Sequence, residues 1–415
     1  MQTFGDLFTG KTLQSAHLTN LGHCVIKTNR RFTLFKNLLK KKIVSALALT
    51  TVATLSLGVV APSSQAASTT IRIYVSADTN ILDLWEKTLV PAFNKEYPQY
   101  DVKVIFDRNG ANDAQTLAKI TAAVAKKRDP GMDLIDGGIT TTLGSAGLLF
   151  PLYTGLIPNL KMVPKVLVTN GKGGIPYRAS TVLMAYNSKN VKTPPKTLTD
   201  VLTWIKANPG KFTYNAPSGG GSGYSFVQTV LDSQLSASDI LKLQTGADKE
   251  TQVKWAKGWD LLRGLNKFTY GQNGTYPTNN AGTLDLLAKG LVDLAPVWSD
   301  QIASAIKAGT MPKDVKYYGI SGPSLTGGPA FLGIPSTATN RSAARYLVNW
   351  VLSPTAQNLI VAGNMNGIPV IPASKLDPVI GATVSDINIA AIRAGYISAN
   401  AADLRTAWAA EVPGK

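Results

Sequence analysis

The sequence predicts an α/β fold that contains a parallel sheet and more than one lobe. At 415 residues the chain exceeds one ordinary domain, and its 44% hydrophobic and 16% charged residues are typical of a globular protein. From Thr70 onward, segments with strand pattern alternate with segments of helical spacing. This alternation predicts a parallel sheet that is covered by helices on its faces.

The first elements can be assigned in order. The helix at 81–93 carries apolar residues at helical spacing, including Ile81, Trp85, Leu89 and Phe93. Ligands of such sheets collect at the carboxyl ends of the strands, so those ends are the first place to look for a site. Strands are predicted at 70–76, 100–106 and 132–135, and helices at 81–93 and 114–127.

Polar and aromatic residues follow three of the predicted strands. Asp78 follows the first strand, Asp136 ends the third, and Trp298 and Asp300 follow the apolar run 291–297. Asp78 and Asp300 either bind a ligand or cap the helices that come next. Trp298, like Tyr177, either stacks against a ring or a cation or belongs to the core.

A glycine-rich stretch lies near the middle of the chain, at 214–226. Pro217 and the glycines 219–221 and 223 break regular structure, and an apolar pattern that could begin a helix resumes at Phe226. Free N–H groups at such a helix start suit an anionic or polar group, whereas the alternative is a flexible surface loop. No Gly-Lys-Ser/Thr follows, so the stretch is not a nucleotide-binding loop.

The N-terminal segment predicts export. Basic residues between Lys27 and Lys42 precede the uncharged stretch 43–61 and a small-residue pattern that ends at Ala66. This order is that of a secretory signal peptide, and a retained membrane anchor is the alternative. Polar residues and helix breakers in the apolar stretch favour cleavage near Ala66, and no cysteine follows for a lipid anchor. We therefore expect a periplasmic protein that is not a lipoprotein.

Removal of residues 1–66 would narrow the chemistry of the mature protein. His17, His23 and Cys24 are the histidines and the cysteine of the whole chain, and all three precede Ala66. Histidine and thiolate metal sites, disulfides and triad catalysis are then excluded, so we predict no metal and no cofactor. The remaining 34 basic and 24 acidic residues leave a net charge of +10, scattered without a basic stripe, which argues against nucleic-acid binding.

Several segments together resemble the extracellular solute-binding proteins of bacterial ABC importers. One runs from Gly-Ile-Pro-Tyr-Arg at 174–178 to Tyr-Asn at 186–187 and Pro-Pro-Lys-Thr at 194–197. The run 287–298 with its terminal Trp298 is similar to a second-lobe strand of that family. The likeness recurs at 331–340 and in the helix 342–352 that follows. In order, these segments cover most of residues 70–365.

The resemblance implies a type II periplasmic-binding-protein-like fold of two lobes, joined by crossing strands that act as a hinge. Lobe 1 would comprise 67–177 and 322–365, lobe 2 would comprise 178–321, and a helical segment 366–415 would pack across the hinge. A monomer would close on its solute and deliver it to an ABC permease and ATPase. The implied ligand-binding residues are Ser76, Asp78, Thr79, Asp136, Gly137, Tyr177, Arg178, Ser218, Gly221, Ser222, Gly223, Tyr224, Trp298 and Asp300.

The residues leave the solute open among three classes. A cation such as a polyamine or a thiamine-like compound would suit the three aspartates and two aromatic residues, Asp78, Asp136, Asp300, Trp298 and Tyr177. Arg178 and the glycine-rich helix start suit a phosphorylated or carboxylated anion, and the mixture would also suit a sugar. An exported hydrolase or lyase that uses Asp136 and Asp300 as acid and base is the alternative from another class.

Overall fold

The computed structural model describes residues 68–363, 365 and 367–415 of the chain. The basic run, the apolar stretch 43–61 and the expected cleavage near Ala66 lie outside these residues. None of the described helices combines the length and the hydropathy needed to cross a membrane.

The first lobe is built around a parallel three-stranded core. Strand β1 (Thr69–Ala77) pairs in parallel with β2 (Tyr100–Arg108) on one side and with β3 (Leu134–Asp136) on the other. Alternate residues of β1 point to opposite faces. Ile73 lies in one hydrophobic cluster with helices of residues 79–96 and 341–362, and Tyr74 lies in another with the helices that follow β2 and β3. Both faces of the sheet are thus covered.

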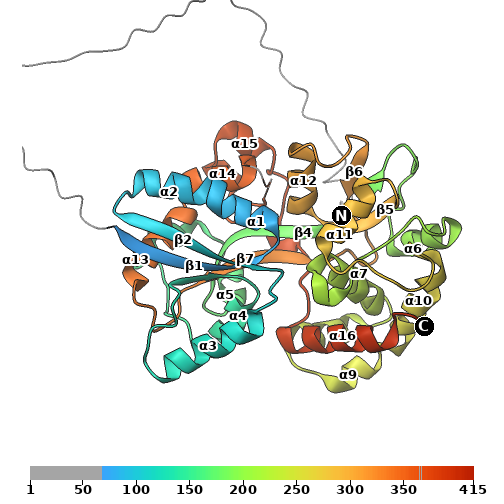
Figure 1. Ribbon diagram of the computed structural model, residues 1–415, viewed down its shortest axis with the longest axis horizontal. Helices are drawn as coiled ribbons and strands as arrows, with labels where there is room; N and C mark the ends of the chain where they lie inside the picture. The colour runs from blue at the N-terminus through green and yellow to red at the C-terminus, as the bar shows by residue number, and fades with distance from the viewer. Residues whose placement is uncertain (1–67, 364, 366) are drawn as a thin grey trace, which may run out of the picture. The chain divides into compact units, whose positions relative to one another are not determined.

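Figure 1 shows β1 and β2 in blue, on the side of the molecule opposite to α6 and α16. The elements that pack with β1–β3 come from two separate parts of the sequence. They are α1 (Thr79–Leu84), the π-helical turn Trp85–Leu89, α2 (Val90–Glu96), α3 (Asp113–Ala125), α4 (Ile139–Ser145), the 3-10 helix Pro158–Met162, α5 (Lys165–Asn170), α13 (Arg341–Val351), α14 (Pro354–Ala362), the 3-10 helix Ala373–Lys375 and α15 (Pro378–Ala382).

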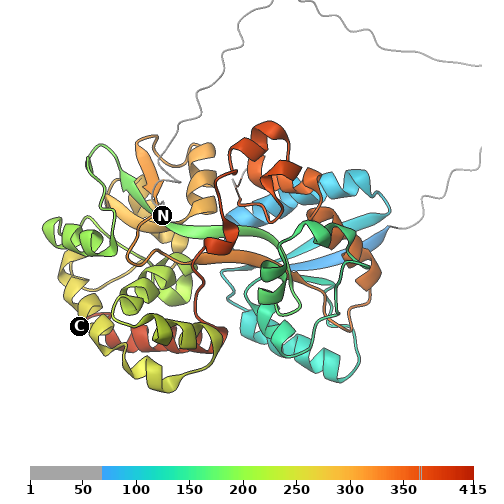
Figure 2. The same cartoon turned by 180° about the vertical axis from the view of Figure 1, so that it is seen from behind.

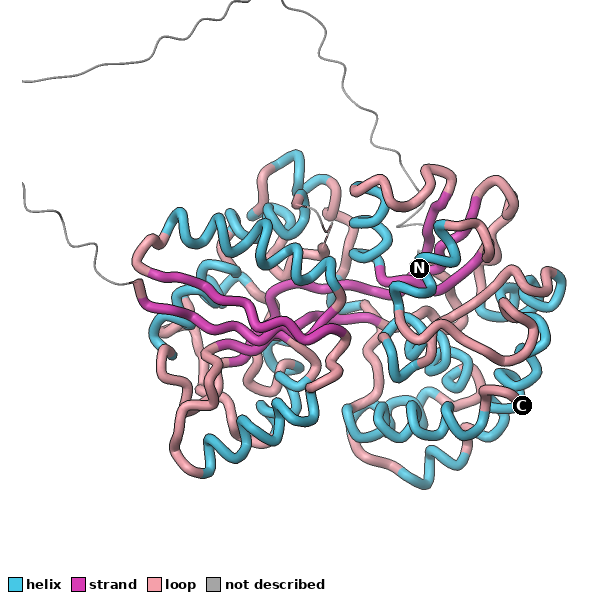
Figure 3. The backbone as a smooth tube through the Cα atoms, viewed as in Figure 1, coloured by secondary structure: helices cyan, strands magenta, loops and turns pink. Residues whose placement is uncertain are grey.

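Two long strands connect the lobes. Strand β4 (Ile175–Asn187) pairs with β7 (Gly327–Gly333) through its first half and with β5 (Leu294–Trp298) and β6 (Val315–Tyr318) through its second half. The order across the sheet is β2-β1-β3-β7-β4-β5, with β6 also on β4. Figures 1 and 2 show β4 and β7 side by side between the two lobes, and Figure 3 shows the strands as one magenta band.

The second lobe surrounds β5, whose residues are buried between helices. Phe212, Phe226 and Leu294 belong to one hydrophobic cluster, which also receives Trp408 from the C-terminal helix. A smaller cluster on the other side contains Val297 and Ile302. The remaining elements of the chain are α6 (Leu198–Ala207), the 3-10 helix Pro217–Gly219, α7 (Gly221–Asp232), α8 (Ala237–Thr245), α9 (Lys249–Val253), α10 (Ala256–Leu265), the 3-10 helix Asn266–Phe268, α11 (Asn280–Ala288), α12 (Ser299–Lys307), the 3-10 helix Ile389–Ala391 and α16 (Ser398–Glu411).

The structure corrects the expectation of a mostly parallel sheet in each lobe. Strands β1, β2 and β3 pair in parallel as expected, but β4 pairs antiparallel with β5, β6 and β7. The reason is that β4 enters the second lobe from the first and so runs away from the junction, whereas β5 runs back towards it. Parallel pairing in the second lobe is found in the bridge from Phe212 to Leu294.

The predicted continuous helix at 81–93 is also interrupted. The N–H of Val90 donates to the carbonyl of Trp85, five residues earlier, which makes a π-helical turn at Trp85–Leu89. Pro91, in the first turn of α2, has no N–H to continue the regular pattern. The wider turn lets the chain remain helical on both sides of this proline.

Candidate functional site

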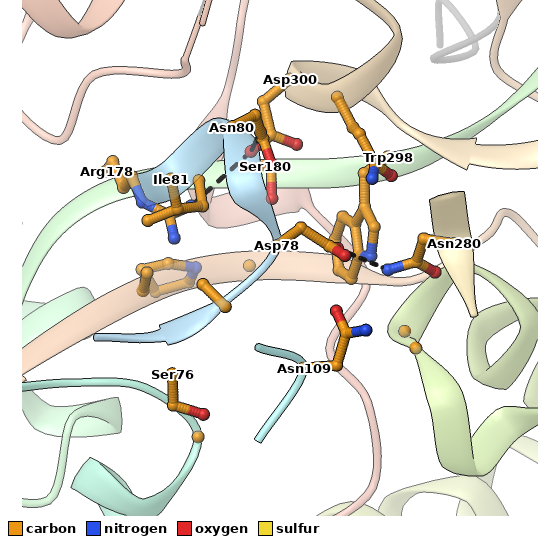
Figure 4. A pocket seen from close by; sticks show the side chains of 18 of the residues that line it. Ser76, Asp78, Asn80, Ile81, Asn109, Arg178, Ser180, Asn280, Trp298 and Asp300 are labelled. Carbon is orange, nitrogen blue, oxygen red and sulfur yellow. Dashed lines mark hydrogen bonds and ion pairs between the residues drawn. The ribbon is translucent and has the colours of Figure 1, made fainter. Parts of the chain in front are cut away.

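A cavity of about 360 Å³ lies where the ends of β1 and β5 approach the crossing strands. Both lobes contribute to its lining, and Figure 4 shows the side chains pointing inward from several elements, with Asp300 and Trp298 on one side and Ser76 and Asn109 on the other. It is lined by Ser76, Ala77, Asp78, Asn80, Ile81, Asn109, Asp113, Gly138, Arg178, Ser180, Gly220, Gly221, Asn280, Trp298, Asp300, Gln301, Gly328, Pro329 and Ala330.

A second cavity of about 290 Å³ adjoins the first on the side of the first lobe. The two cavities share part of their lining, including Ser76 and Arg178. Asp136, Gly137 and Phe331 belong to the second cavity alone. A solute that extends past Arg178 would therefore reach the end of β3.

Carboxylates dominate the charge around the first cavity. Asp78, Asp113 and Asp300 line it, and Arg178 is the cationic side chain among its lining residues. Burial raises the pKa of Asp78; the hydrogen bond from Asn280 opposes this rise, and the charge of Asp300 adds to it. Burial also raises the pKa of Asp300, against the nearby charge of Arg178. The two carboxylates therefore disfavour each other's ionised form.

Arg178 is held by a buried network beneath the cavity. Its Nε donates to the Tyr177 hydroxyl at 2.7 Å, and that hydroxyl donates to Asp136 Oδ2 at 2.6 Å. The Trp85 indole nitrogen donates to the same oxygen at 2.8 Å. Arg178 Nη1 lies 3.8 Å from Asp300 Oδ2. The Arg178 guanidinium therefore interacts with the Asp300 carboxylate on one side and, through the Tyr177 hydroxyl, with the Asp136 carboxylate on the other.

Two hydrogen bonds cross between the lobes at this cavity. Asn280 Nδ2, on α11 of the second lobe, donates to Asp78 Oδ2 at 2.6 Å. Asn80 Nδ2, on α1 of the first lobe, donates to Asp300 Oδ2 at 3.3 Å. Figure 4 shows Asp78 and Asn280 side chains directed at each other across the cavity. Each of the two aspartates therefore accepts a hydrogen bond from the opposite lobe.

The glycine-rich stretch does begin a helix, but most of its N–H donors already have acceptors within the protein. The N–H of Gly223 donates to Asn215 Oδ1 at 3.0 Å, and that of Ser222 donates to Asn280 Oδ1 at 3.3 Å. A β-carbon on Gly221 would lie 2.4 Å from the Trp298 indole, and one on Gly223 would lie 1.8 Å from the Asn215 carbonyl oxygen. These glycines allow close packing.

The structure brings together more than half of the predicted site residues. Ser76, Asp78, Arg178, Gly221, Trp298 and Asp300 line the first cavity, and Asp136 and Gly137 line the second. Neither cavity is lined by the other six predicted residues, Thr79, Tyr177, Ser218, Ser222, Gly223 and Tyr224.

Three of these residues have well-defined positions away from the two cavities. Tyr177 is fully buried because its hydroxyl bridges Asp136 and Arg178 on the far side of the cavity wall. Tyr224 is buried in the second-lobe core, where the Arg405 guanidinium lies 5.0 Å from its ring centroid. Ser218 is exposed, in the turn before α7.

Sequence reasoning missed several lining residues, among them Ser180, Asn280 and Gln301. Ser180 could have been found, because it lies two residues after Arg178 on a strand and so shares its face. The Asn279-Asn280 pair before an apolar run is a helix-start signal, and Asn279 does cap α11. That signal says nothing about Asp78, which lies 202 residues earlier in the chain.

Among the residues that the structure describes, no group of three or more His, Cys, Asp or Glu side chains is arranged to hold a metal ion.

Residues 88–386 match the family described as bacterial extracellular solute-binding protein. The chain belongs to this family. This chain is therefore a bacterial extracellular solute-binding protein. The two-lobed α/β fold predicted from the sequence is confirmed.

Individual proteins are similar to this chain in sequence or in fold. Protein YnjB of Escherichia coli (strain K12) is 26% identical over 258 residues, which cover 60% of this chain and 66% of YnjB. Maltose-bound MalE3 of T. maritima superposes on this chain with a TM-score of 0.64 at 14% identity. The superposition covers 84% of this chain and 96% of MalE3. Iron-bound HitA of Pseudomonas aeruginosa superposes with a TM-score of 0.57 at 20% identity. The superposition covers 82% of this chain and 99% of HitA. A sugar and a metal thus occupy the same fold, so the fold alone leaves the solute of this protein open.

Proposed function

We propose that this solute-binding protein captures a small organic cation in the 360 Å³ cavity and delivers it to an ABC permease and ATPase. One observation carries the proposal: Asp78 and Asp300, from opposite lobes, line the same cavity beside the Trp298 indole. A cation between them would offset their mutual repulsion, and it would touch both only when the lobes are closed. A ligand of that kind favours closure because it binds the closed state better than the open one.

The aromatic side chain supports the same class of solute. Trp298 lines the cavity next to the carboxylates, and a cation over an indole face gains about 0.5 to 2 kcal/mol. Arg178 does not reverse this preference, because its charge is shared with Asp300 and, through Tyr177, with Asp136. Of the residues predicted from the sequence, we therefore propose that Asp78, Trp298 and Asp300 bind the cation. Ser76, Arg178 and Gly221 line the same cavity around them.

An anionic solute is less well supported. The helix start at Gly221, which could have bound an anion, has its Ser222 and Gly223 N–H groups bonded to Asn280 and Asn215. An anion in the cavity would also face three aspartates. A neutral sugar would leave the repulsion between Asp78 and Asp300 uncompensated.

Further parts of the proposal concern the whole protein. We propose lobes at 67–177 with 322–365 and at 178–321, a C-terminal segment 366–415, cleavage near Ala66 and a periplasmic monomer. The described residues of the C-terminal segment contribute Val370 and Leu376 to the first-lobe core and Leu404 to the second, which supports a role in joining the lobes. We also propose that the protein leaves its solute chemically unchanged.

Calorimetric titration of the mature protein tests the solute class. Spermidine, putrescine and thiamine are compared with fructose-6-phosphate and maltose, and we expect binding by at least one of the cations and by neither of the others. Asp300→Asn should weaken cation binding at least tenfold. Asp314→Asn is the matched control, because that aspartate pairs with Lys189 on the surface. Binding of the phosphate or the sugar in place of a cation would overturn the proposal, and mass spectrometry after incubation would reveal any turnover.

A further inference from the structure

We infer that the solute is a zwitterion: its cationic group lies between Asp78 and Asp300, and its anionic group, a carboxylate or a phosphate, binds Arg178. The inference rests on the proposed function, since it names a second charged group of the solute that occupies the same cavity. Its basis is the buried guanidinium of Arg178, most of whose N–H groups have no acceptor in the described part of the protein.

The hydrogen bonds of Arg178 involve a single nitrogen. A guanidinium has N–H donors on Nε and on both Nη atoms. Nε donates to the Tyr177 hydroxyl at 2.7 Å. Nη1 lies 3.8 Å from Asp300 Oδ2, which makes an ion pair but is too long for a hydrogen bond. Within residues 68–363, 365 and 367–415, neither Nη atom of Arg178 has a hydrogen-bond acceptor.

The two Nη atoms can be reached from the cavities. Arg178 is 7% exposed, and it lines both the first and the second cavity. Neither Nη atom belongs to the buried side-chain atoms that lack both a partner and accessible surface, so both keep some accessible surface. Figure 4 shows the Arg178 side chain directed inward, at the end of the first cavity away from Trp298 and Asn280. A group of the solute can therefore contact these donors.

The charges along the two cavities are arranged as a zwitterion requires. The three aspartates that line the first cavity do not line the second. The carboxylate of the second cavity is Asp136, whose Oδ2 already accepts hydrogen bonds from two buried side chains. Arg178 is the charged side chain that the two cavities share. An anionic group beside Arg178, on the side of the second cavity, would therefore leave the three aspartates to the cationic group.

This arrangement separates zwitterions from linear diamines. A diamine that spans the same distance would place its second ammonium group beside the guanidinium, where like charges repel each other more strongly than in water. A carboxylate or a phosphate would instead accept hydrogen bonds from the Nη atoms, and such bonds to arginine are frequently bidentate. Since buried donors without acceptors cost free energy, a solute with no acceptor at this point should bind less tightly.

Matched pairs of probes test the inference by calorimetry of the mature protein. Putrescine is compared with γ-aminobutyrate, agmatine with γ-guanidinobutyrate, and thiamine with thiamine phosphate. The second probe of each pair has an anionic group where the first has an amine or a hydroxyl. We expect the zwitterion of at least one pair to bind about tenfold or more tightly than its partner. If no zwitterion binds more tightly than its partner, the inference fails, and binding of any of the cations still leaves the proposed function standing.

Butyrate separates a failure of the inference from a failure of the proposed function. It has the carboxylate of γ-aminobutyrate without the cationic group, so we expect it to bind at least about tenfold more weakly than the best zwitterion. If butyrate, fructose-6-phosphate or maltose binds more tightly than every cation and zwitterion, both the inference and the proposed function are overturned.

Variants of Arg178 show which group recognises the anion. Arg178→Gln removes both Nη atoms and should abolish the preference for the zwitterion, whereas Arg178→Lys keeps a charge without the planar fork and should keep part of the preference. The ratio of affinities within a pair is the readout, because a general loss of stability affects both probes alike. Arg128→Gln is the control, since Arg128 is exposed and lines neither cavity. An unchanged ratio in Arg178→Gln would overturn the inference, and the pairs measured on the unaltered protein test it even if these variants do not fold.

Discussion

Asn280 bonds to both lobes at once: its amide nitrogen donates to Asp78 Oδ2 of the first lobe at 2.6 Å, and its amide oxygen accepts from Ser222 of the second lobe at 2.7 Å. The contact between the lobes is therefore anchored at the start of α7 and α11. Asp78 is half-buried, and the charge of Asp300 lies near it, so the donor from Asn280 matters for holding the Asp78 carboxylate in place.

Replacing Asn280 with aspartate should favour separation of the lobes. Asn280→Asp keeps an oxygen that accepts from Ser222, but it replaces the amide donor to Asp78 with a second carboxylate. A hydrogen bond to a charged group contributes about 1.5 to 3 kcal/mol, and the variant loses that bond between the lobes. We expect a larger radius of gyration by small-angle scattering in the absence of solute. Asn279→Asp is the control, since either residue can cap α11. An equal radius for the two variants would show that the bond does not hold the lobes.

Cation affinity should fall as the pH is lowered. Burial raises the pKa values of Asp78 and Asp300 above the ordinary value of an aspartate, so protons compete with the cation at higher pH than at a surface carboxylate. Affinity should be constant above both raised pKa values and should decrease by up to about tenfold per pH unit for each group below them. Calorimetry between about pH 8 and pH 4 measures this. In Asp300→Asn the slope should be shallower; affinity that rises on acidification would contradict the prediction.

The same two groups should affect the stability of the free protein in the opposite direction. Their folded-state pKa values lie above those of the unfolded chain, so the folded protein binds more protons in this range. Their contribution to stability is present below the unfolded pKa and is lost as the pH rises through the folded pKa. Comparison of the pH dependence of urea unfolding between the protein and Asp300→Asn isolates the effect of one group.

Asp133 should be important for the stability of the first lobe. Arg72 donates to its two carboxylate oxygens at 2.8 and 2.9 Å, and the N–H of Asn340 donates at 3.0 Å, which joins β1 to the start of α13. Burial raises the pKa of Asp133, but these hydrogen bonds outweigh it and the pKa is lowered. Asp133→Asn should cost about 2 to 4 kcal/mol in urea unfolding. Asp101→Asn, which removes an exposed pair with Lys103, should cost about 1 kcal/mol or less.

Gly223 should tolerate no side chain, in contrast to a glycine elsewhere in the same lobe. A β-carbon at Gly223 would lie 1.8 Å from the Asn215 carbonyl oxygen, so Gly223→Ala should destabilise by about 3 kcal/mol or more. Gly264, exposed on α10, has nothing within 4 Å of such a carbon, and Gly264→Ala should stabilise by about 0.5 to 1 kcal/mol. Melting curves of the two variants test this, and equal melting temperatures would contradict it.

Much of the site could be predicted because it lies at the ends of strands. The alternation of strand and helix patterns is local, and in a parallel sheet it brings the carboxyl ends of β1 and β3 to one edge. This edge predicts Asp78 and Asp136, whereas Trp298 and Asp300 are predicted because they follow the apolar run 291–297. Ser76 is predicted at the end of the first strand, and the resemblance places Arg178 at the crossing strand.

The sequence by itself determined the α/β class, the two lobes, the family and the strand ends where polar residues gather, because these depend on local periodicity and on motifs in order. Only the tertiary structure decided which face each side chain takes and which distant partner it meets. Tyr177 lies where the pairing register of β4 with β7 shifts, and its hydroxyl turns towards Asp136. The N–H donors at the start of α7 bond to Asn215 and Asn280. Asn280 meets Asp78 across 202 positions of the chain, a contact that depends on the packing of two lobes and leaves no periodic signal in either segment.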